Sequence, residues 1–349
     1  MSGLIKINKI FIILTPFHKQ AFWAKYGDEM TKNNVLILKD KNIENVFFLN
    51  YNSKILTLPD INFSVFKFQE GFFKTLYNYR NKVKVIQNYC DQLVLTTNFE
   101  NKVLINIGTD RDVFTQIFLN KIYNLKKFQL SLFAFDEGLG YYDTKTFTDK
   151  IKKLVYPILS PLLFNEKLRF YKPMGHDRRI DKVYCRFPDL ISKNGFSTYE
   201  NLNVRENNNT GTYNTLSKKA LVFSFPNQDL NIKDEVKIVW ISEIQKIVNT
   251  KEFIIKLHPR EKIPDLEKIA LEKKWILIEE ASMKRINYFD YKYIINFYSS
   301  VVIDILKSGY PADKIITIDF GNTINLSSLY DKTTKIKIKN LYGEDKIRL

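Results

Sequence analysis

Short apolar runs alternate with amphipathic segments along the first half of the chain. The runs have the length and the β-branched or aromatic content of buried strands, and apolar residues at helical spacing follow several of them. Strands that alternate with helices imply βαβ units and a parallel sheet. The predicted strands are residues 9–14, 34–38, 46–49, 102–106 and 130–135, with a turn at 15–18 and helices around 21–25 and 113–119.

A polar stretch separates this pattern from a second one of the same kind. Residues 201–218 include a run of Glu, Asn, Thr and Gly without a periodic apolar signal, which is typical of a linker or mobile loop. Because 349 residues exceed the size at which a single core stops growing, we predict two Rossmann-like α/β domains, 1–200 and 219–349. The second is predicted to hold strands at 220–225, 253–257, 275–278, 293–297 and 315–318 and helices at 233–248, 264–272 and 301–307.

Polar motifs directly follow three of the predicted strands. Parallel α/β sheets bind ligands outside the carboxyl ends of their strands, which is where these motifs begin. An acidic pair, a histidine and two hydroxyls supply the base, the acid and the phosphate contacts that transfer from a phosphate-activated donor requires. We therefore predict a transferase. The motifs are Asp136-Glu137-Gly138, His258-Pro259-Arg260 and Ser299-Ser300.

The acidic motif is the predicted source of a general base. The carboxylate of Asp136 or Glu137 can take the proton of an attacking hydroxyl, and Gly138 lets the backbone approach a substrate closely. The alternative is a solvated acidic turn after a strand.

The motifs of the second domain are predicted to hold a phosphate. His258, fixed by Pro259, can donate to a leaving phosphate, and Arg260 adds positive charge beside it. The alternative is a structural histidine in a loop. Ser299 and Ser300 precede a predicted helix, so they are either ordinary N-caps or phosphate ligands at a helix start.

Four further residues lie at predicted strand ends. Glu279 follows the strand at 275–278 and can accept hydrogen bonds from ribose hydroxyls. Thr15, Pro16 and Asp110 follow strands of the first domain and are predicted contacts of the acceptor or the donor sugar. The alternative for all four is a plain loop or turn residue.

The order and spacing of these motifs resemble those of bacterial sialyltransferases. Ser299 lies 41 residues after His258, and the acidic pair with its glycine precedes both. The sequence is most similar to glycosyltransferase family 52, whose motifs are shared by the polysialyltransferases of family 38. The segments Leu14-Thr15-Pro16 and Ile278-Glu279-Glu280 also resemble family 52. Two Rossmann-like domains with a cleft between them form the GT-B fold, which this resemblance also implies.

The resemblance implies a specific reaction. Sialic acid would move from CMP-sialic acid to a terminal galactose of a bacterial lipooligosaccharide or capsule, with inversion, α-2,3 linkage and neither a metal ion nor a cofactor. Asp136 would be the base, His258 would stabilise the departing CMP phosphate, Ser299 and Ser300 would bind that phosphate, and Glu279 would contact the cytidine ribose. Relatives often carry two aspartates at the acidic pair, so this chain leaves open whether Asp136 or Glu137 faces the acceptor.

The net positive charge of the chain is compatible with other partners and other functions. Fifty-four Lys and Arg against 38 Asp and Glu give a net charge of +16, which favours an anionic partner or serves solubility alone. The rivals are a GT-B enzyme with another donor such as CMP-Kdo or a UDP-hexose, a polysialyltransferase, and a non-catalytic membrane-surface or nucleic-acid binder. The sequence has no RNP-like, helix-turn-helix or zinc pattern, so nucleic acid is not expected. The oligomeric state, including a homo-oligomer, stays open.

Two basic, apolar segments predict contact with an anionic membrane. They are residues 151–172 and the tail at 335–339, and a buried helix with charged ends is the alternative for the first. The apolar run at 10–14 is too short to span a bilayer, and the spacing of Cys90 and Cys185 suggests neither a disulfide framework nor a zinc site. We expect a cytoplasmic protein that is peripheral to the inner face of the plasma membrane.

Overall fold

The computed structural model describes residues 5–48, 50–59, 72–136, 141–142, 147–169, 174–191, 193–202, 213–224, 234–257, 266–278, 286–297, 299, 301–319 and 333–337. The chain divides into two compact units. Unit 1 comprises Met1–Tyr141 and Lys145–Val204, and unit 2 comprises Tyr142–Thr144 and Arg205–Leu349. The division between Val204 and Arg205 lies within the segment 201–218.

Unit 1 is built on a seven-stranded sheet with the order β3-β2-β1-β4-β5-β6-β7. Every pairing in it is parallel. The central strands are almost continuously apolar, as expected where both faces of a parallel sheet are covered. The strands are β1 (Ile7–Ile13), β2 (Val35–Lys39), β3 (Lys54–Thr57), β4 (Phe99–Ile107), β5 (Gln129–Phe135), β6 (Lys182–Cys185) and β7 (Thr198–Asn201).

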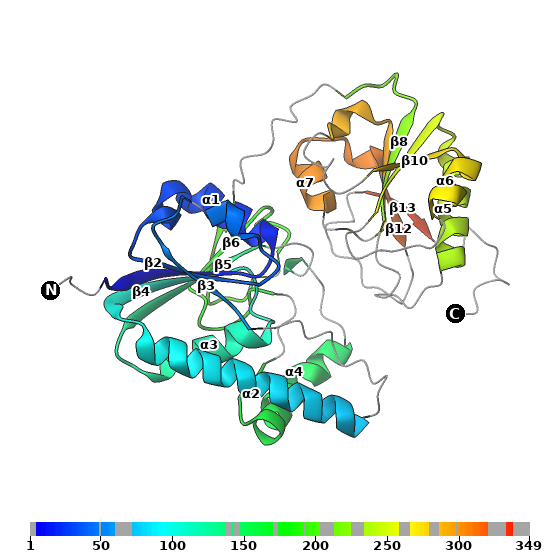
Figure 1. Ribbon diagram of the computed structural model, residues 1–349. Helices are drawn as coiled ribbons and strands as arrows, with labels where there is room; N and C mark the ends of the chain where they lie inside the picture. The colour runs from blue at the N-terminus through cyan, green and yellow to red at the C-terminus, as the bar shows by residue number, and fades with distance from the viewer. Residues whose placement is uncertain are drawn as a thin grey trace. The chain divides into compact units, whose positions relative to one another are not determined.

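Helices cover both faces of this sheet. One face carries α1, and the other carries α2 and α3 (Figure 1). On the α1 face, the Phe22 ring contacts Phe11 and Phe135 at centroid distances of 5.3 and 4.8 Å, so this side chain joins α1 to β1 and β5. The helical elements are α1 (Pro16–Tyr26), η1 (Gly27–Thr31), η2 (Asn45–Phe48), α2 (Phe72–Thr96), α3 (Val113–Asn124) and α4 (Phe147–Phe164).

Unit 2 repeats the arrangement with six parallel strands in the order β10-β9-β8-β11-β12-β13. Its core gathers Trp240 and Ile244 of the first helix against Phe253, Ile295 and other sheet residues. The elements are β8 (Lys219–Phe223), α5 (Asp234–Val248), β9 (Glu252–Lys256), α6 (Leu266–Lys273), β10 (Trp275–Ile278), η7 (Tyr288–Asp290), β11 (Tyr293–Asn296), α7 (Val301–Lys307), η8 (Ala312–Lys314), β12 (Ile315–Asp319) and β13 (Thr334–Lys337).

Both sheets reverse their strand order at a comparable place. In unit 1 the chain starts at β1, moves outward through β2 and β3, and returns to pair β4 with β1. In unit 2 the same reversal places β11 beside β8. Ligands of doubly wound sheets bind at such a switch point, outside the carboxyl ends of the strands. The loops after β1 and β4, and after β8 and β11, are therefore candidate ligand-binding loops.

Three sequence-based predictions of local structure were wrong or incomplete. The strand predicted at 46–49 is not formed by residues 46–48, because Asn45–Phe48 make the short helix η2 and the strand follows at Lys54–Thr57. The expected turn at 15–18 belongs to α1, since Thr15 caps the helix and Pro16 occupies its first turn. Much of the basic tail is part of the sheet: β13 pairs in parallel with β12.

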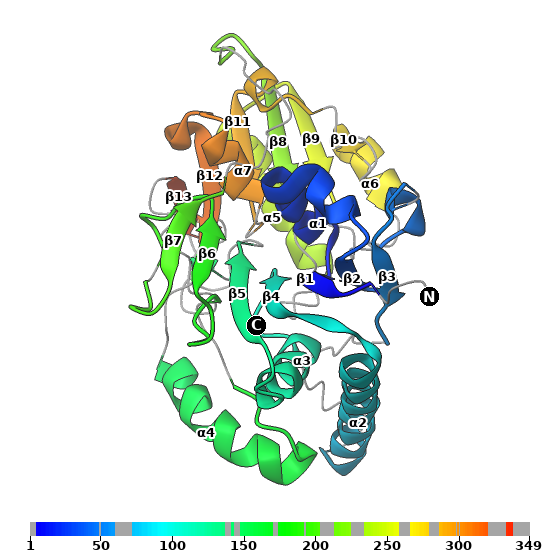
Figure 2. The ribbon, with the colours of Figure 1, turned by 90° about the vertical axis from the view of Figure 1, so that its left-hand side faces the viewer.

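Helix α4 lies at the margin of unit 1, and its last turn meets α2 (Figure 2). The side-chain amide of Gln87 donates to the carbonyl of Phe164 at 3.1 Å, and the rings of Tyr79 and Phe164 lie 4.8 Å apart. The helix contains Pro157 and Pro161. Among the helices that the structure describes, none combines the length and the apolar character needed to cross a bilayer.

Candidate active site

The switch point of unit 1 begins with the cap of α1. Thr15 is extended and its hydroxyl accepts from the backbone N–H of His18 at 3.3 Å, while Pro16 is exposed. The two residues predicted to contact a sugar thus form the start of a helix directly after β1. A sugar contact by Thr15 or Pro16 stays a prediction.

His18 lies across this switch point. Its ring is buried, and Nδ1 accepts from the backbone N–H of Leu14 at 3.1 Å, which leaves the neutral ring's proton on Nε2. Gly108 follows β4, and a Cβ atom there would overlap the His18 ring. Glycine at position 108 is therefore what allows the loops after β1 and β4 to approach each other.

Asp110 is an anchor for a loop rather than an exposed ligand. It is fully buried, and its carboxylate accepts from the backbone N–H groups of Gly175, His176 and Asp177 at 3.1, 2.9 and 2.9 Å. Gly175 has a left-handed φ of +78°, a conformation that favours glycine. These bonds fix the loop that leads into β6. The sugar contact that the sequence predicts for Asp110 stays a prediction.

Titration of Asp110 gives a testable pH dependence. Burial raises the pKa of this carboxyl to about 7, although the N–H donors of Gly175 and Asp177 act in the opposite direction. A pKa that is higher in the folded chain stabilises the fold fully below the unfolded value of 3.8 and loses that effect as pH rises through 7. The melting temperature of wild type relative to Asp110→Asn, measured by thermal shift, should therefore fall from about pH 5 to about pH 8. If the melting temperature of wild type relative to Asp110→Asn rises with pH instead, the N–H donors lower the pKa of Asp110 by more than burial raises it.

Asp136 lies directly after β5 and is fully buried. Its backbone N–H donates to the carbonyl of Tyr184 at 2.8 Å, which extends the pairing of β5 with β6 by one residue. The carboxylate accepts from Arg186, with Nη2 3.0 Å from Oδ1 and both Nε and the backbone N–H 3.1 Å from Oδ2. The predicted base is thus a bidentate partner of an arginine.

Arg186 connects three strand ends. It follows β6, pairs with Asp136 after β5, and places its guanidinium 4.6 Å from the ring centre of Phe17, in the first turn of α1 after β1. It is only 3% exposed. A buried guanidinium that holds both carboxylate oxygens fixes the direction of the Asp136 side chain and hence the start of the acidic motif.

In unit 2, Ser299 has the contacts of a helix start. Its backbone N–H donates to Oδ1 of Asn296 at 2.8 Å, and its hydroxyl accepts from the N–H of Val301 at 3.4 Å. This is the N-cap alternative, and the predicted phosphate contact of Ser299 stays a prediction. Nδ2 of Asn296 is buried without a hydrogen-bond partner, and such an amide group is costly to leave unpaired. Asn296 is therefore a candidate donor to a ligand at this edge.

The sheet of unit 2 brings its two motif loops to one edge. Strands β9 and β11 both pair with β8, so the loops that begin at Leu257 and Phe297 leave the same edge on either side of β8. Two strand spacings make about 10 Å. The described strand ends that precede the two motifs are thus separated by one intervening strand, and a shared phosphate contact of the motifs stays a prediction. The other predicted residues lie outside the described part of the chain: Glu137, Gly138, His258, Pro259, Arg260, Glu279 and Ser300.

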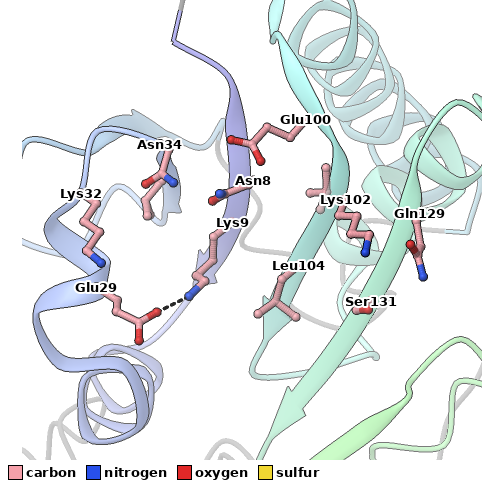
Figure 3. A pocket seen from close by; sticks show the side chains of 12 residues that line it. Asn8, Lys9, Glu29, Lys32, Asn34, Glu100, Lys102, Leu104, Gln129 and Ser131 are labelled. Carbon is pink, nitrogen blue, oxygen red and sulfur yellow. Dashed lines mark hydrogen bonds and ion pairs between the residues drawn. The ribbon is translucent and has the colours of Figure 1, made fainter.

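A polar hollow of about 450 Å³ lies elsewhere in unit 1 (Figure 3). Its lining includes Lys9, Lys102 and Ser131, which come from the amino-terminal parts of β1, β4 and β5. The ion pair between Lys9 and Glu29 lies on one side of it (Figure 3). The hollow is therefore remote from the carboxyl ends of these strands, and we do not assign it a ligand.

Sequence reasoning missed Arg186, His18 and Asn296. Arg186 has no local motif around it, and its partner is 50 residues away. His18 could have been noticed as one of three histidines, placed in the first loop of a Rossmann-like domain. Asn296 could have been noticed as a polar residue ending an apolar strand. Within the described ranges, no three His, Cys, Asp or Glu side chains gather closely enough to hold a metal ion.

Comparison with known proteins decides the family. The model of the alpha-2,8-polysialyltransferase (POLYST) family matches residues 9–304. The chain belongs to this polysialyltransferase family. The match runs through both units and includes the acidic, His-Pro and Ser-Ser motifs. A search among curated protein sequences finds no match.

Solved structures resemble this member of the polysialyltransferase family in fold. An alpha/beta-galactoside alpha-2,3-sialyltransferase from the luminous marine bacterium Photobacterium phosphoreum superposes with a TM-score of 0.50 at 12% identity, covering 94% of each chain. Arabidopsis thaliana UGT89C1, complexed with UDP-L-rhamnose, has a TM-score of 0.53 at 10% identity, covering 95% of this chain and 85% of that one. The predicted GT-B fold and the resemblance to bacterial sialyltransferases are confirmed.

Proposed function

We propose that this protein transfers sialic acid from CMP-sialic acid to a hydroxyl of a bacterial surface glycan, with inversion and without a metal ion. The observation that carries the proposal is the family match over residues 9–304. Polar motifs after strands of both units support it, because a nucleotide-sugar transfer needs an acceptor side and a donor side. The glycan would be a lipooligosaccharide or capsule precursor at the inner face of the membrane.

The acidic motif would take the proton of the acceptor hydroxyl. The hydroxyl oxygen attacks the anomeric carbon while the bond from that carbon to the CMP phosphate oxygen breaks, and the proton passes to a carboxylate. Asp136 is the proposed base, with Glu137 as the alternative. The pairing of Asp136 with Arg186 adds a constraint: Arg186 must keep Asp136 aimed while one carboxylate lone pair stays available to the acceptor.

The motifs of unit 2 would bind the leaving group. CMP departs as a phosphate monoester, so positive charge and N–H or O–H donors at that phosphate stabilise the transition state. His258 would donate to the phosphate, Ser299 and Ser300 would bind its oxygens, and Glu279 would accept from the ribose. Arg260 would pair with the phosphate or with the carboxylate of the sugar.

Two acceptors remain in competition. A terminal galactose, giving an α-2,3 linkage, is what the resemblance to family 52 implies. A sialic acid residue, giving a polymer, is favoured by the description of the family to which the chain belongs. Both reactions use the same donor and the same departing group, so the acceptor alone separates them.

Mass spectrometry of products tests the proposal. Purified protein is incubated with CMP-sialic acid and either lactose or a short oligosialic acid, with and without EDTA. We expect acceptor products larger by one or more sialic acid residues, in equal amounts with EDTA, and a thermal shift with CMP. Controls use CMP-Kdo and a UDP-hexose as donors. Transfer only from a control donor, or no transfer with no CMP shift, would contradict the proposal.

A further inference from the structure

Helix α4 presents a continuous apolar stripe to solvent. Leu154, Ile158 and Leu162 are 71, 66 and 77% exposed, and they follow one another at spacings of four residues. Ile151 and Val155 extend the stripe at helical spacing and are also exposed. Single exposed leucines are ordinary on protein surfaces, but a contiguous stripe of large apolar side chains marks a contact surface.

The opposite side of α4 is the one that packs on unit 1. Ser160 and Phe164 are buried, and the Ser160 hydroxyl accepts from the N–H of Leu168 at 2.8 Å. Beyond the helix, Arg169 donates its N–H to Oε1 of Gln116 in α3 at 2.7 Å. The helix is therefore held by the side that carries Ser160 and Phe164 and by its carboxyl-terminal end, so the apolar stripe faces outward and is not an unpacked core face.

Exposed basic side chains lie on α4 and on the helix that it contacts. Lys150, Lys152 and Lys153, in the first two turns of α4, are all exposed. The neighbouring α2 has Arg80 and Lys84, also exposed, and its residues 72–90 include no acidic side chain. An exposed apolar stripe on a helix with exposed lysines complements one class of partner well, because the acyl chains of a bilayer accept the stripe and anionic headgroups accept the lysines.

We propose that the outward face of α4 lies in the headgroup zone of an anionic lipid bilayer and anchors unit 1 to it. The helix lies parallel to the membrane, with Leu154, Ile158 and Leu162 among the upper acyl carbons and the lysines of its first two turns at the phosphates. This contact is independent of the proposed transfer reaction. It concerns one face of the segment 151–172 predicted from sequence, and it leaves out the basic tail, whose residues 335–337 belong to β13.

Vesicle flotation of the full-length protein tests this contact. The vesicles contain phosphatidylcholine alone or with phosphatidylglycerol. We expect flotation with the anionic vesicles and at least about tenfold weaker binding to the neutral ones. The variant Leu154→Gln/Ile158→Gln/Leu162→Gln removes the apolar stripe without touching the packed side, and it should lose flotation while keeping the circular dichroism and melting temperature of wild type.

A matched variant controls for apolar surface in general. Leu95→Gln/Leu216→Gln/Leu271→Gln replaces three leucines that are 81, 85 and 80% exposed on other parts of the chain, and it should float like wild type. The charge variant Lys150→Gln/Lys152→Gln/Lys153→Gln should lose the preference for anionic vesicles. Wild type that does not float, or α4 and control variants that float equally well, would overturn the proposal. If only the α4 variant changes the oligomeric state in light scattering, and no vesicle binding is seen, the face joins two copies and the lipid assignment is wrong.

Discussion

Asparagine in place of Asp136 is expected to lower the rate of sialic acid transfer by about 10²- to 10⁴-fold, the usual contribution of a general base. The amide keeps the shape of the side chain and can still accept one hydrogen bond from Arg186, but it cannot take a proton. CMP should still bind, because the donor contacts are predicted to lie in unit 2. Transfer is measured with saturating CMP-sialic acid, and CMP binding by calorimetry.

The control for this substitution has to be another buried aspartate with an arginine partner. Asp177 is fully buried and pairs with Arg179, with Oδ2 2.6 Å from Nη2, but it lies before β6 rather than at its carboxyl end. Asp177→Asn should therefore change stability without a comparable loss of transfer. His258→Ala is the contrasting variant, because it should weaken CMP binding as well as transfer.

Two results would change the assignment of the base. If Asp136→Asn keeps near-normal transfer and Glu137→Gln loses it, then Glu137 is the base and Asp136 only positions the motif. If both variants retain transfer, the acidic motif has no part in proton removal and the proposed reaction scheme fails.

Methionine in place of Arg186 is expected to lower the free energy of unfolding by about 3–5 kcal/mol, because it leaves the buried carboxylate of Asp136 without its partner. The desolvated carboxylate would keep only weaker hydrogen bonds, and the contact with the Phe17 ring would also be lost. Urea denaturation followed by hydrogen-exchange mass spectrometry measures the change and assigns it to β5 and β6.

The double variant Asp136→Asn/Arg186→Met separates the pair from its parts. Because the second substitution removes a charge that the first has left unpaired, the double variant should be less destabilised than the sum of the two single variants. Arg179→Met is the matched control: its guanidinium is 23% exposed, so water can replace part of the contact and the loss should be smaller. Additive effects of Asp136→Asn and Arg186→Met would mean that the ion pair contributes nothing beyond its separate side chains.

The apolar pattern predicted the central strands well and the edges poorly. Runs such as those of β1, β2 and β9 are buried on both faces, so their strands can be recognised without any knowledge of neighbours. Strand β6 and the edge strand β7 have only four residues each, and β7 has the sequence TYEN, with no apolar run. Residues 46–49 have the composition of a strand, but residues 46–48 belong to the short helix η2, Asn45–Phe48.

The candidate site was predictable in its motifs and not in its contacts. Strand ends can be located from sequence, and parallel topology then places them at one edge, which is why Asp136 could be singled out. The identity of its partner depends on how β6 pairs with β5, and nothing in the local sequence around Arg186 signals that pairing. For the same reason Asp110 was expected to face a sugar, whereas its carboxylate is enclosed by three backbone N–H groups from a loop 65 to 67 residues away.

The segment from Gly175 to Arg186 is hydrogen-bonded at both ends to acidic side chains that follow neighbouring strands. Asp110, after β4, accepts from Gly175 at its beginning, and Asp136, after β5, accepts from Arg186 at its end. The distance between the two points of attachment is fixed. An extra residue inserted between Gly175 and Arg186 would therefore have to form a bulge or break the hydrogen bonds at one end. A change of loop length that keeps both contacts therefore has to lie outside this span.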